Sequence, residues 1–169
     1  MRWVAYNGMV TVCLLLFLFL LLPIQLVGAA DVVVRVLTVH EGDQFTIYHQ
    51  GRKDKIHLKD IDCPDPKQPY GKQAKHMTAA YIGNREIVLR DLTRDRQGRL
   101  TGEILLPNGK LLTQELIREG LAWVQPNTSN RQALKDLEEL ASAARTGLWS
   151  EPNPIPPWKW KPTKPAYQN

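Results

Sequence analysis

Cysteine is scarce in this sequence. Only Cys13 and Cys63 occur among its 169 residues. Cys13 lies inside the apolar N-terminal segment, so removal of that segment would leave Cys63 alone. Because a single cysteine cannot form an internal disulfide, a fold held together by such bonds is excluded. The remaining chain would tolerate oxidising conditions but would form no internal disulfide under them.

Long hydrophobic runs are also rare, and the one present lies near the N-terminus. Residues 1–30 contain Arg2, an apolar run from Met9 to Leu22, and the small residues Gly28 and Ala30. This order is typical of a secretory signal. We therefore expect cleavage after Ala30 and export to the periplasm or the exterior. The alternative is an uncleaved membrane anchor, since the apolar region can be extended to a spanning length.

Negative charge is in the minority. Lys and Arg total 22, Asp and Glu total 17, and the sequence pI is about 9.3. This balance favours a polyanionic partner without identifying one. Solubility alone is an alternative explanation for a mildly basic exported protein.

The hydrophobic pattern beyond residue 30 predicts one domain over residues 31–150. Period-two alternation favours strands, and apolar residues three or four apart favour helices. We expect strands at 31–38, 44–50, 53–60, 86–91 and 99–106, and helices at 71–81, at 111–119 and from a capping sequence at 129–132 to 147. Five strands with a helix after the third predict a five-stranded Greek-key β-barrel with helices, of the OB-fold type. A generic α+β sandwich is the alternative.

The tail, residues 151–169, is rich in proline and tryptophan, and we expect it to be extended. Trp158 and Trp160 are flanked by lysines, which is typical of a stacking platform for single-stranded bases. Packing of Trp158 against the barrel is the alternative that we prefer.

The stretch from Ile56 to Gly71 resembles a strand that leads into a binding site. Asp62 and Asp65 lie on either side of Cys63 and Pro64, and two further prolines follow. Prolines fix φ and remove backbone donors, so the turn is expected to be stiff. A stiff acidic turn suits a hard cation.

Seven motifs, in this order and spacing, resemble those of the staphylococcal nuclease or thermonuclease-like family. They are Glu41-Gly42-Asp43, Ile61-Asp62-Cys63-Pro64-Asp65, Gln68-Pro69-Tyr70-Gly71-Lys72-Gln73-Ala74, Asp95-Arg96-Gln97-Gly98-Arg99, Gly120-Leu121-Ala122-Trp123-Val124, Gly147-Leu148-Trp149 and Pro156-Pro157-Trp158. The resemblance implies an OB-fold barrel and a Ca²⁺-dependent phosphodiesterase that cleaves DNA and RNA. It also suggests a monomer whose partner is nucleic acid and which needs no small-molecule cofactor.

The resemblance implies that Asp43, Asp62 and the backbone carbonyl of Cys63 bind the metal. Calcium takes hard oxygen ligands of these kinds. Two carboxylates would bind it weakly, which is workable outside the cytosol, where sites with dissociation constants of about 10⁻⁴–10⁻³ M still fill. The thiol of Cys63 is expected to be inert, because no histidine stands at a catalytic spacing from it.

Two of the three catalytic positions depart from the family pattern. Asp65 stands where active members have a glutamate that serves as general base, and a misplacement of about 1 Å can cost roughly a hundredfold in rate. Arg99 matches one of the two phosphate-holding arginines, and His57 replaces the other. Imidazole offers at most two donors, where guanidinium offers five. His57 would assist when protonated, which would lower the pH optimum; a plain, partly exposed strand residue is the alternative.

Further polar residues surround these positions. Lys72 and Arg96 are candidates for binding the nucleic-acid backbone, although a solvated charged face is the alternative. Gln97 and Gln125 stand where relatives often have tyrosines associated with substrate contact. Asp60 is expected to point away from His57 by strand alternation.

These observations predict an exported calcium-dependent nuclease with a detuned site. An alternative is an impaired OB-fold module that binds single-stranded nucleic acid or another polyanion. A third possibility is an interaction protein that uses its proline-tryptophan tail. Fold alone does not decide between them.

Overall fold

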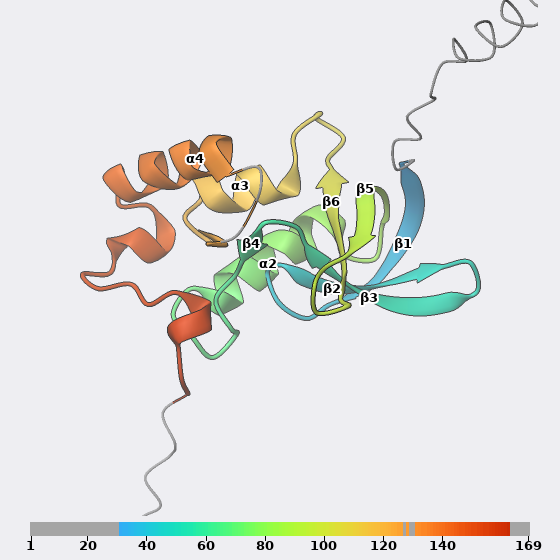
Figure 1. Ribbon diagram of the computed structural model, residues 1–169, viewed down its shortest axis with the longest axis horizontal. Coiled ribbons are helices and arrows are strands. Elements are labelled where there is room, and N and C mark those ends of the chain that lie inside the picture. Colours follow the sequence, from blue (N-terminus) through green and yellow to red (C-terminus); the bar gives the residue numbers. More distant parts are fainter. Residues whose placement is uncertain (1–30, 127, 129–130, 163–169) are drawn as a thin grey trace, which may run out of the picture.

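A computed structural model describes residues 31–126, 128 and 131–162, and these residues form a small barrel with helices packed at one side (Figure 1). The expected signal segment, residues 1–30, lies outside the described residues, as do Ser129 and Asn130 of the expected capping sequence. Within the described residues, no helix is both long enough and apolar enough to cross a membrane.

The barrel is closed by five strands in the order β1-β2-β3-β6-β5. All neighbouring pairs are antiparallel except β3 and β6, which are parallel. The predicted barrel with helices is therefore confirmed. The strands are β1 (Val32–Val39), β2 (Gln44–His49), β3 (Arg52–Leu58), β5 (Glu86–Arg94) and β6 (Leu100–Leu105).

The barrel interior is filled by inward-facing residues from every strand. In β2, Phe45 and Ile47 are fully buried while Tyr48 is exposed, which is the alternation of a strand with one face on the core. Ile56 and Leu89 are likewise inaccessible to solvent. Burying each such side chain contributes about 1.5–3 kcal/mol, so the barrel is a stiff support for the loops at its ends.

Helix α2 (Gly71–Ile82) follows the proline-rich turn, as predicted, and packs on the barrel through Ala74, Thr78 and Ile82. Thr78 donates a hydrogen bond from Oγ1 to the backbone carbonyl of Gly42 at 2.6 Å. Because Gly42 lies in the turn between β1 and β2, this bond fixes that turn to the helix.

Helices α3 (Leu112–Arg118) and α4 (Arg131–Ala143) pack on each other beside the barrel (Figure 1). The predicted second helix is confirmed, but the predicted extension of the third helix to Gly147 is wrong. Arg145 and Gly147 both have positive φ, at 52° and 55°. Left-handed residues end an α-helix, so residues Gly147–Ser150 form the separate 3₁₀ helix η1.

A second sheet was not predicted from the sequence. Strand β4 (Ile61–Asp62) pairs with β7 (Trp123–Val124), and Asp62 lies opposite Trp123. The third barrel strand ends at Leu58, before the predicted Asp60, because Asp60 has a φ of 66°. The acidic turn therefore starts from its own small sheet and not from the end of the barrel strand.

The C-terminal strap, defined as residues 151–160, is mainly extended, with one 3₁₀ turn, η2 (Pro157–Lys159). Ile155 accepts a hydrogen bond from Gln68 Nε2 at 2.6 Å. The ring of Trp158 lies edge-on to that of Trp123, with centroids 6.1 Å apart. The packing role preferred for Trp158 agrees with this contact, although Trp123 belongs to β7 and not to the barrel.

Candidate functional site

The turn between β1 and β2 lies directly against the turn after β4. A β-carbon added to Gly42 would come within 2.7 Å of both Cys63 Sγ and Ala74 Cβ. Real β-carbons do not approach so closely, so only glycine allows these two turns and α2 to meet. This close approach brings the carboxylates of Asp43 and Asp62 into one region of the molecule.

Asp43 is buried, with 5% of its surface exposed. Its carboxylate accepts backbone hydrogen bonds from its own N–H and that of Cys63, yet burial, together with the charges of Asp62 and Glu41, raises its pKa to about 8. Within the described part of the chain, Asp43 Oδ1 has no hydrogen-bond partner. A buried acceptor without a partner is uncommon in native proteins, and a cation would satisfy it.

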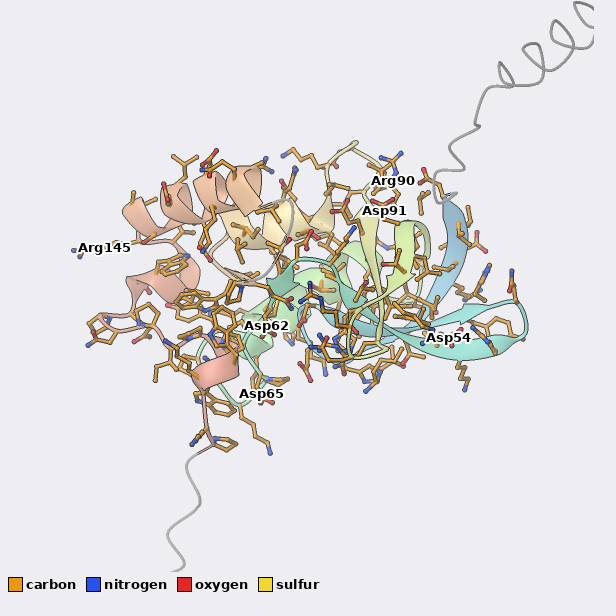
Figure 2. The ribbon with its side chains drawn as sticks, in the orientation of Figure 1. Asp54, Asp62, Asp65, Arg90, Asp91 and Arg145 are labelled. Carbon is orange, nitrogen blue, oxygen red and sulfur yellow. The ribbon has the colours of Figure 1, made fainter. Side chains whose placement is uncertain are left out.

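Asp62 lies in β4. Burial raises its pKa to about 6, while the charge of Arg99 opposes that rise and that of Glu41 adds to it. In Figure 2, Asp62 and Asp65 lie on the same side of the molecule, far from the β2–β3 hairpin that carries Asp54. Asp62 thus lies close enough to Asp43 to raise the pKa of that carboxyl, and close enough to Arg99 for the arginine to counter the rise in its own pKa.

Asp65 is used partly by its own loop. Its Oδ1 accepts a hydrogen bond from the backbone N–H of Lys67 at 2.8 Å, and its backbone carbonyl accepts one from Gln68 at 2.7 Å. A β-carbon on Gly71 would overlap that same carbonyl oxygen. One carboxylate oxygen of Asp65 therefore stabilises the turn, as aspartates commonly do.

Glu41, which stands where the family pattern has an aspartate beside the metal, was not among the predicted ligands or catalytic residues. It is about half-buried, and its pKa is raised first by burial and next by the charge of Asp65. Glu41, Asp43, Asp62 and Asp65 form what we call the acidic cluster. The Glu-Gly-Asp spacing in the first turn was the available signal, since it places two carboxylates two residues apart.

The acidic cluster does not form a complete metal-binding cage by side chains alone. No group of three His, Cys, Asp or Glu side chains in residues 31–126, 128 and 131–162 has the geometry to hold a metal ion. Asp43 and Asp62 supply the hard oxygens that calcium prefers, and backbone carbonyl and water oxygens commonly complete such sites. The donor set and the orphaned Asp43 Oδ1 fit a calcium ion on these terms.

A hollow of about 390 Å³, which we call the basic hollow, brings together three of the predicted residues: His57, Arg96 and Arg99. Lys59 and Arg94 also line it, and so do Gln97 and Gln125. Lys72 does not, because it lies in the first turn of α2 and lines a different, shallow hollow formed by residues 66–70, 72 and 73. The two predicted substrate-binding residues are thus on separate surfaces.

Arg99 is held in place by Asp95. Its Nε donates to Asp95 Oδ2 at 2.7 Å, and its backbone N–H donates to Asp95 Oδ1 at 2.9 Å. The Arg99 side chain is 46% exposed. Asp95 therefore orients the guanidinium while part of it stays open to solvent in the basic hollow.

His57 is about half-buried. Burial lowers its pKa, and the charges of Arg99 and Lys55 lower it further. Its Nε2 lies 3.5 Å from Gln44 Nε2. The structure therefore favours a neutral His57 at pH 7, which reduces the assistance expected from its protonated form.

The prediction that Asp60 points away from the face of His57 is wrong, because both residues line the basic hollow. The left-handed conformation of Asp60 ends the strand and removes the alternation on which the prediction relied. Gln125 fixes the backbone at Asp60 and Ile61. Its Nε2 donates to the carbonyl of Ile61 at 2.9 Å, and its backbone N–H donates to the carbonyl of Asp60.

The fold and site define a class of small β-barrel proteins that combine a buried acidic cluster with a neighbouring basic hollow. The family model described as "Staphylococcal nuclease homologue" matches residues 55–151. The chain therefore belongs to the family of staphylococcal nuclease homologues, which confirms the resemblance inferred from the motifs.

Two relatives illustrate this membership. An "Uncharacterized endonuclease" of Escherichia coli O157:H7 is 33% identical over 135 residues, which cover 80% of this chain and 88% of that protein. The "Staphylococcal-like nuclease CAN1" of Arabidopsis thaliana is 35% identical over 113 residues, or 67% of this chain and 35% of that longer protein. The similarity to the bacterial relative thus spans most of both chains.

Proposed function

We propose that this protein is an exported nuclease that hydrolyses phosphodiester bonds of DNA or RNA with calcium as its metal. The observation that carries the proposal is the buried Asp43 Oδ1, which lacks a partner in the described structure and lies close enough to Asp62 for that charge to raise the pKa of Asp43. The names of the two relatives, an endonuclease and a nuclease, support the same activity.

Asp43, Asp62 and the backbone carbonyl of Cys63 would hold the calcium ion. Bound calcium would polarise the phosphate and orient a water molecule. Arg99, oriented by Asp95, would bind the phosphate and stabilise the negative charge that grows on it in the transition state. Neutral His57 would supply at most one hydrogen-bond donor to the same phosphate.

Asp65 is our candidate general base. The attacking water forms a bond to phosphorus, the bond to the leaving oxygen breaks, and the proton of the water passes to Asp65. Only one of its carboxylate oxygens is free of the hydrogen bond to Lys67. Since a base must come within about 2.6–3.2 Å of the proton that it takes, a short side chain partly bound to its own loop supports slow hydrolysis.

The second candidate is a nucleic-acid-binding module without significant hydrolysis. The commitment of Asp65 to its own turn and the lowered pKa of His57 favour it, because both weaken catalysis while the basic hollow remains. A barrel of this type can bind single strands without cutting them.

The deciding experiment uses purified protein lacking residues 1–30 with denatured DNA and with RNA. We expect calcium-dependent cleavage that is abolished by a chelator and by Asp43→Asn, a substitution that preserves shape and removes the charge. Tight binding without cleavage in calcium would instead establish the second candidate. N-terminal sequencing of the exported protein tests cleavage after Ala30, and sedimentation tests the expected monomer.

A further inference from the structure

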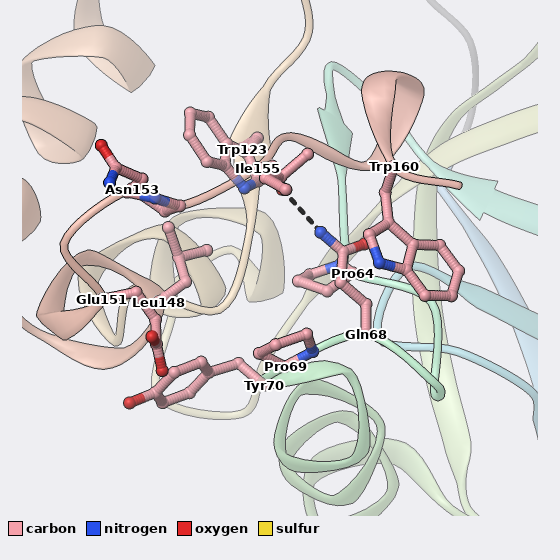
Figure 3. A pocket seen from close by; sticks show the side chains of 11 residues that line it. Pro64, Gln68, Pro69, Tyr70, Trp123, Leu148, Glu151, Asn153, Ile155 and Trp160 are labelled. Atoms are coloured by element: carbon pink, nitrogen blue, oxygen red, sulfur yellow. Dashed lines mark hydrogen bonds between the residues drawn. The ribbon is translucent and has the colours of Figure 1, made fainter. Parts of the chain in front are cut away.

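A second cavity, of about 200 Å³, lies between the turn Pro64–Tyr70 and the C-terminal strap (Figure 3). We call it the strap cavity. It shares no lining residue with the basic hollow. Its walls are mostly rings and aliphatic groups, contributed by Pro64, Pro69, Tyr70, Trp123, Leu148, Ile155 and Trp160.

Gln68 gives this mostly apolar cavity, whose lining also includes the exposed Glu151 and Asn153, a buried polar group. The residue is 7% exposed, and its Nε2 donates to the carbonyl of Ile155 at 2.6 Å. Because a carbonyl can only accept, this bond fixes which end of the amide is the nitrogen. The opposite atom, Oε1, is buried and has no hydrogen-bond partner among the described residues. In Figure 3 the Gln68 amide lies between Ile155 and Trp160.

Tyr70 supports one wall of the cavity at the cost of backbone strain. Its φ is 65°, an uncommon conformation for a residue with a large side chain. Its hydroxyl forms a 2.6 Å hydrogen bond with Ser150 Oγ. A strained residue persists where its surroundings hold it, and such residues gather at functional sites. The strain therefore marks this wall as a candidate ligand contact.

The shape and chemistry of the cavity restrict its occupant. The volume is below the roughly 300–1,000 Å³ of typical sites for drug-sized ligands, so it suits a single ring system. Aromatic faces such as those of Trp123, Trp160 and Tyr70 stack on nucleobases. The free Gln68 Oε1 requires an N–H or O–H donor, and the exposed edges of unpaired bases carry N–H groups.

Lysines lie beside the cavity, although the lining itself contains the acidic Glu151. Lys67 and Lys72 lie on the shallow hollow around Pro66–Gln73, which shares Gln68, Pro69 and Tyr70 with the strap cavity. Both lysine side chains are exposed, as is Lys159 of the strap. Lysines in this position would neutralise the phosphates next to a bound base.

We propose that the strap cavity binds one unpaired nucleobase of a single-stranded nucleic acid, with the adjoining phosphates on Lys67 and Lys72. The proposal rests on the proposed function in taking nucleic acid as the ligand. Trp160 stacks on the base, Trp123, which is packed against Trp149 and Trp158, forms part of the wall beside it, and Gln68 Oε1 accepts a hydrogen bond from it.

The test is a binding measurement in a chelator, so that cleavage cannot occur. The probe is a fluorescein-labelled single strand of twelve thymidines, compared by anisotropy with a strand of the same length and charge that lacks the bases. We expect the thymidine strand to bind roughly tenfold more tightly, as stacking of one base predicts. A third strand, with the N3–H of thymine replaced by a methyl group, should lose part of that advantage.

Matched variants locate the base. Trp160→Ala should remove most of the advantage of the thymidine strand, whereas Tyr48→Ala, which alters an exposed aromatic residue of β2 that lines neither the strap cavity nor the basic hollow, should leave it intact. Gln68→Leu should abolish the difference between thymine and N3-methylthymine. Circular dichroism confirms that each variant is folded.

Equal affinity of wild-type protein for the thymidine and abasic strands would overturn the proposal, as would equal effects of Trp160→Ala and Tyr48→Ala. A labelled proline-rich peptide is the further probe. If Trp160→Ala weakens its binding and the unlabelled thymidine strand does not displace it, the cavity is a peptide site and the proposal is overturned. If the strap cavity shows no base-dependent binding but calcium-dependent cleavage is normal, the nucleobase site is rejected and the proposed nuclease function is kept. If binding depends on the base but no cleavage occurs, the nucleobase site is supported and the nuclease function is rejected.

Discussion

Gly42 and Cys63 are in contact because glycine has no side chain: a β-carbon on Gly42 would lie 2.7 Å from Cys63 Sγ. Gly42→Ala should therefore force the first acidic turn away from the second. Overpacking of this kind commonly costs about 1–3 kcal/mol. Urea unfolding should show that loss.

The matched control for Gly42→Ala is its combination with Cys63→Ala, which removes the sulfur atom. The double variant should be more stable than the sum of the two single effects predicts, because the sulfur no longer obstructs the new methyl group. Strict additivity would mean that the remaining contacts, with the β-carbons of Ala74 at 2.7 Å and of residue 63 at 2.9 Å, limit this position.

The protonation of Asp43 and Asp62 predicts how stability depends on pH without calcium. Their pKa values are about 8 and about 6, against an ordinary value of 3.8. Because both are raised, the folded state binds more protons than the unfolded state, and stability falls as pH rises from about 4 to about 8. Urea unfolding in a chelator at pH 5, 6.5 and 8 should show this decline.

Asp43→Asn is the control for that decline. It removes the group with the larger shift, so the variant should lose stability mainly between pH 4 and 6 and little between pH 6 and 8. At pH 8 without calcium it should be more stable than the wild type, on the order of a few kcal/mol. An unchanged pH profile would mean that Asp43 is ionised in the folded protein throughout this range.

Much of the barrel was predictable, because alternation in strands such as Gln44–His49 directly reports burial on one face. The positions of Asp43 and Asp62 followed from motif resemblance. The predicted ends of the third strand and the third helix were wrong because they depend on backbone dihedral angles. Asp60 and Arg145 have positive φ although neither is glycine. No local pattern indicates that such residues will leave a strand or end a helix.

Contacts between segments far apart in the chain also could not be predicted from the sequence. The two-residue pairing of β4 with β7 is too short to carry a periodic signal. Gln68 meets Ile155 across 87 positions of the chain. Glu41 matched a family position beside the metal but was not chosen as a ligand or catalytic residue, because its interaction with Asp65 depends on the approach of another turn. These features arise from packing, which individual strand and helix patterns do not encode.

Calcium binding should strengthen as pH rises. Asp43 and Asp62 must lose their protons to act as ligands, so binding competes with protonation up to about pH 8. Isothermal titration of the wild type should show an affinity at pH 8 roughly tenfold or more above that at pH 6, with proton release on binding. Constant affinity between these pH values would contradict the assignment of Asp43 and Asp62 as ligands.

Lengthening the candidate base and restoring the second arginine should raise activity. In Asp65→Glu the added methylene lets the carboxylate extend beyond the loop, with loss of the hydrogen bond from the Lys67 N–H. In His57→Arg a permanent charge with five donors replaces a mostly neutral ring. We expect the double variant to raise kcat on denatured DNA by roughly ten- to a hundredfold, since a misplacement of about 1 Å costs up to a hundredfold.

The same changes in the Asp43→Asn background should give no gain, because the metal would not be held. If Asp65→Glu, His57→Arg and the double variant all bind DNA and calcium but none improves kcat, then any catalysis uses a base other than residue 65. Glu41 is then the next residue to substitute.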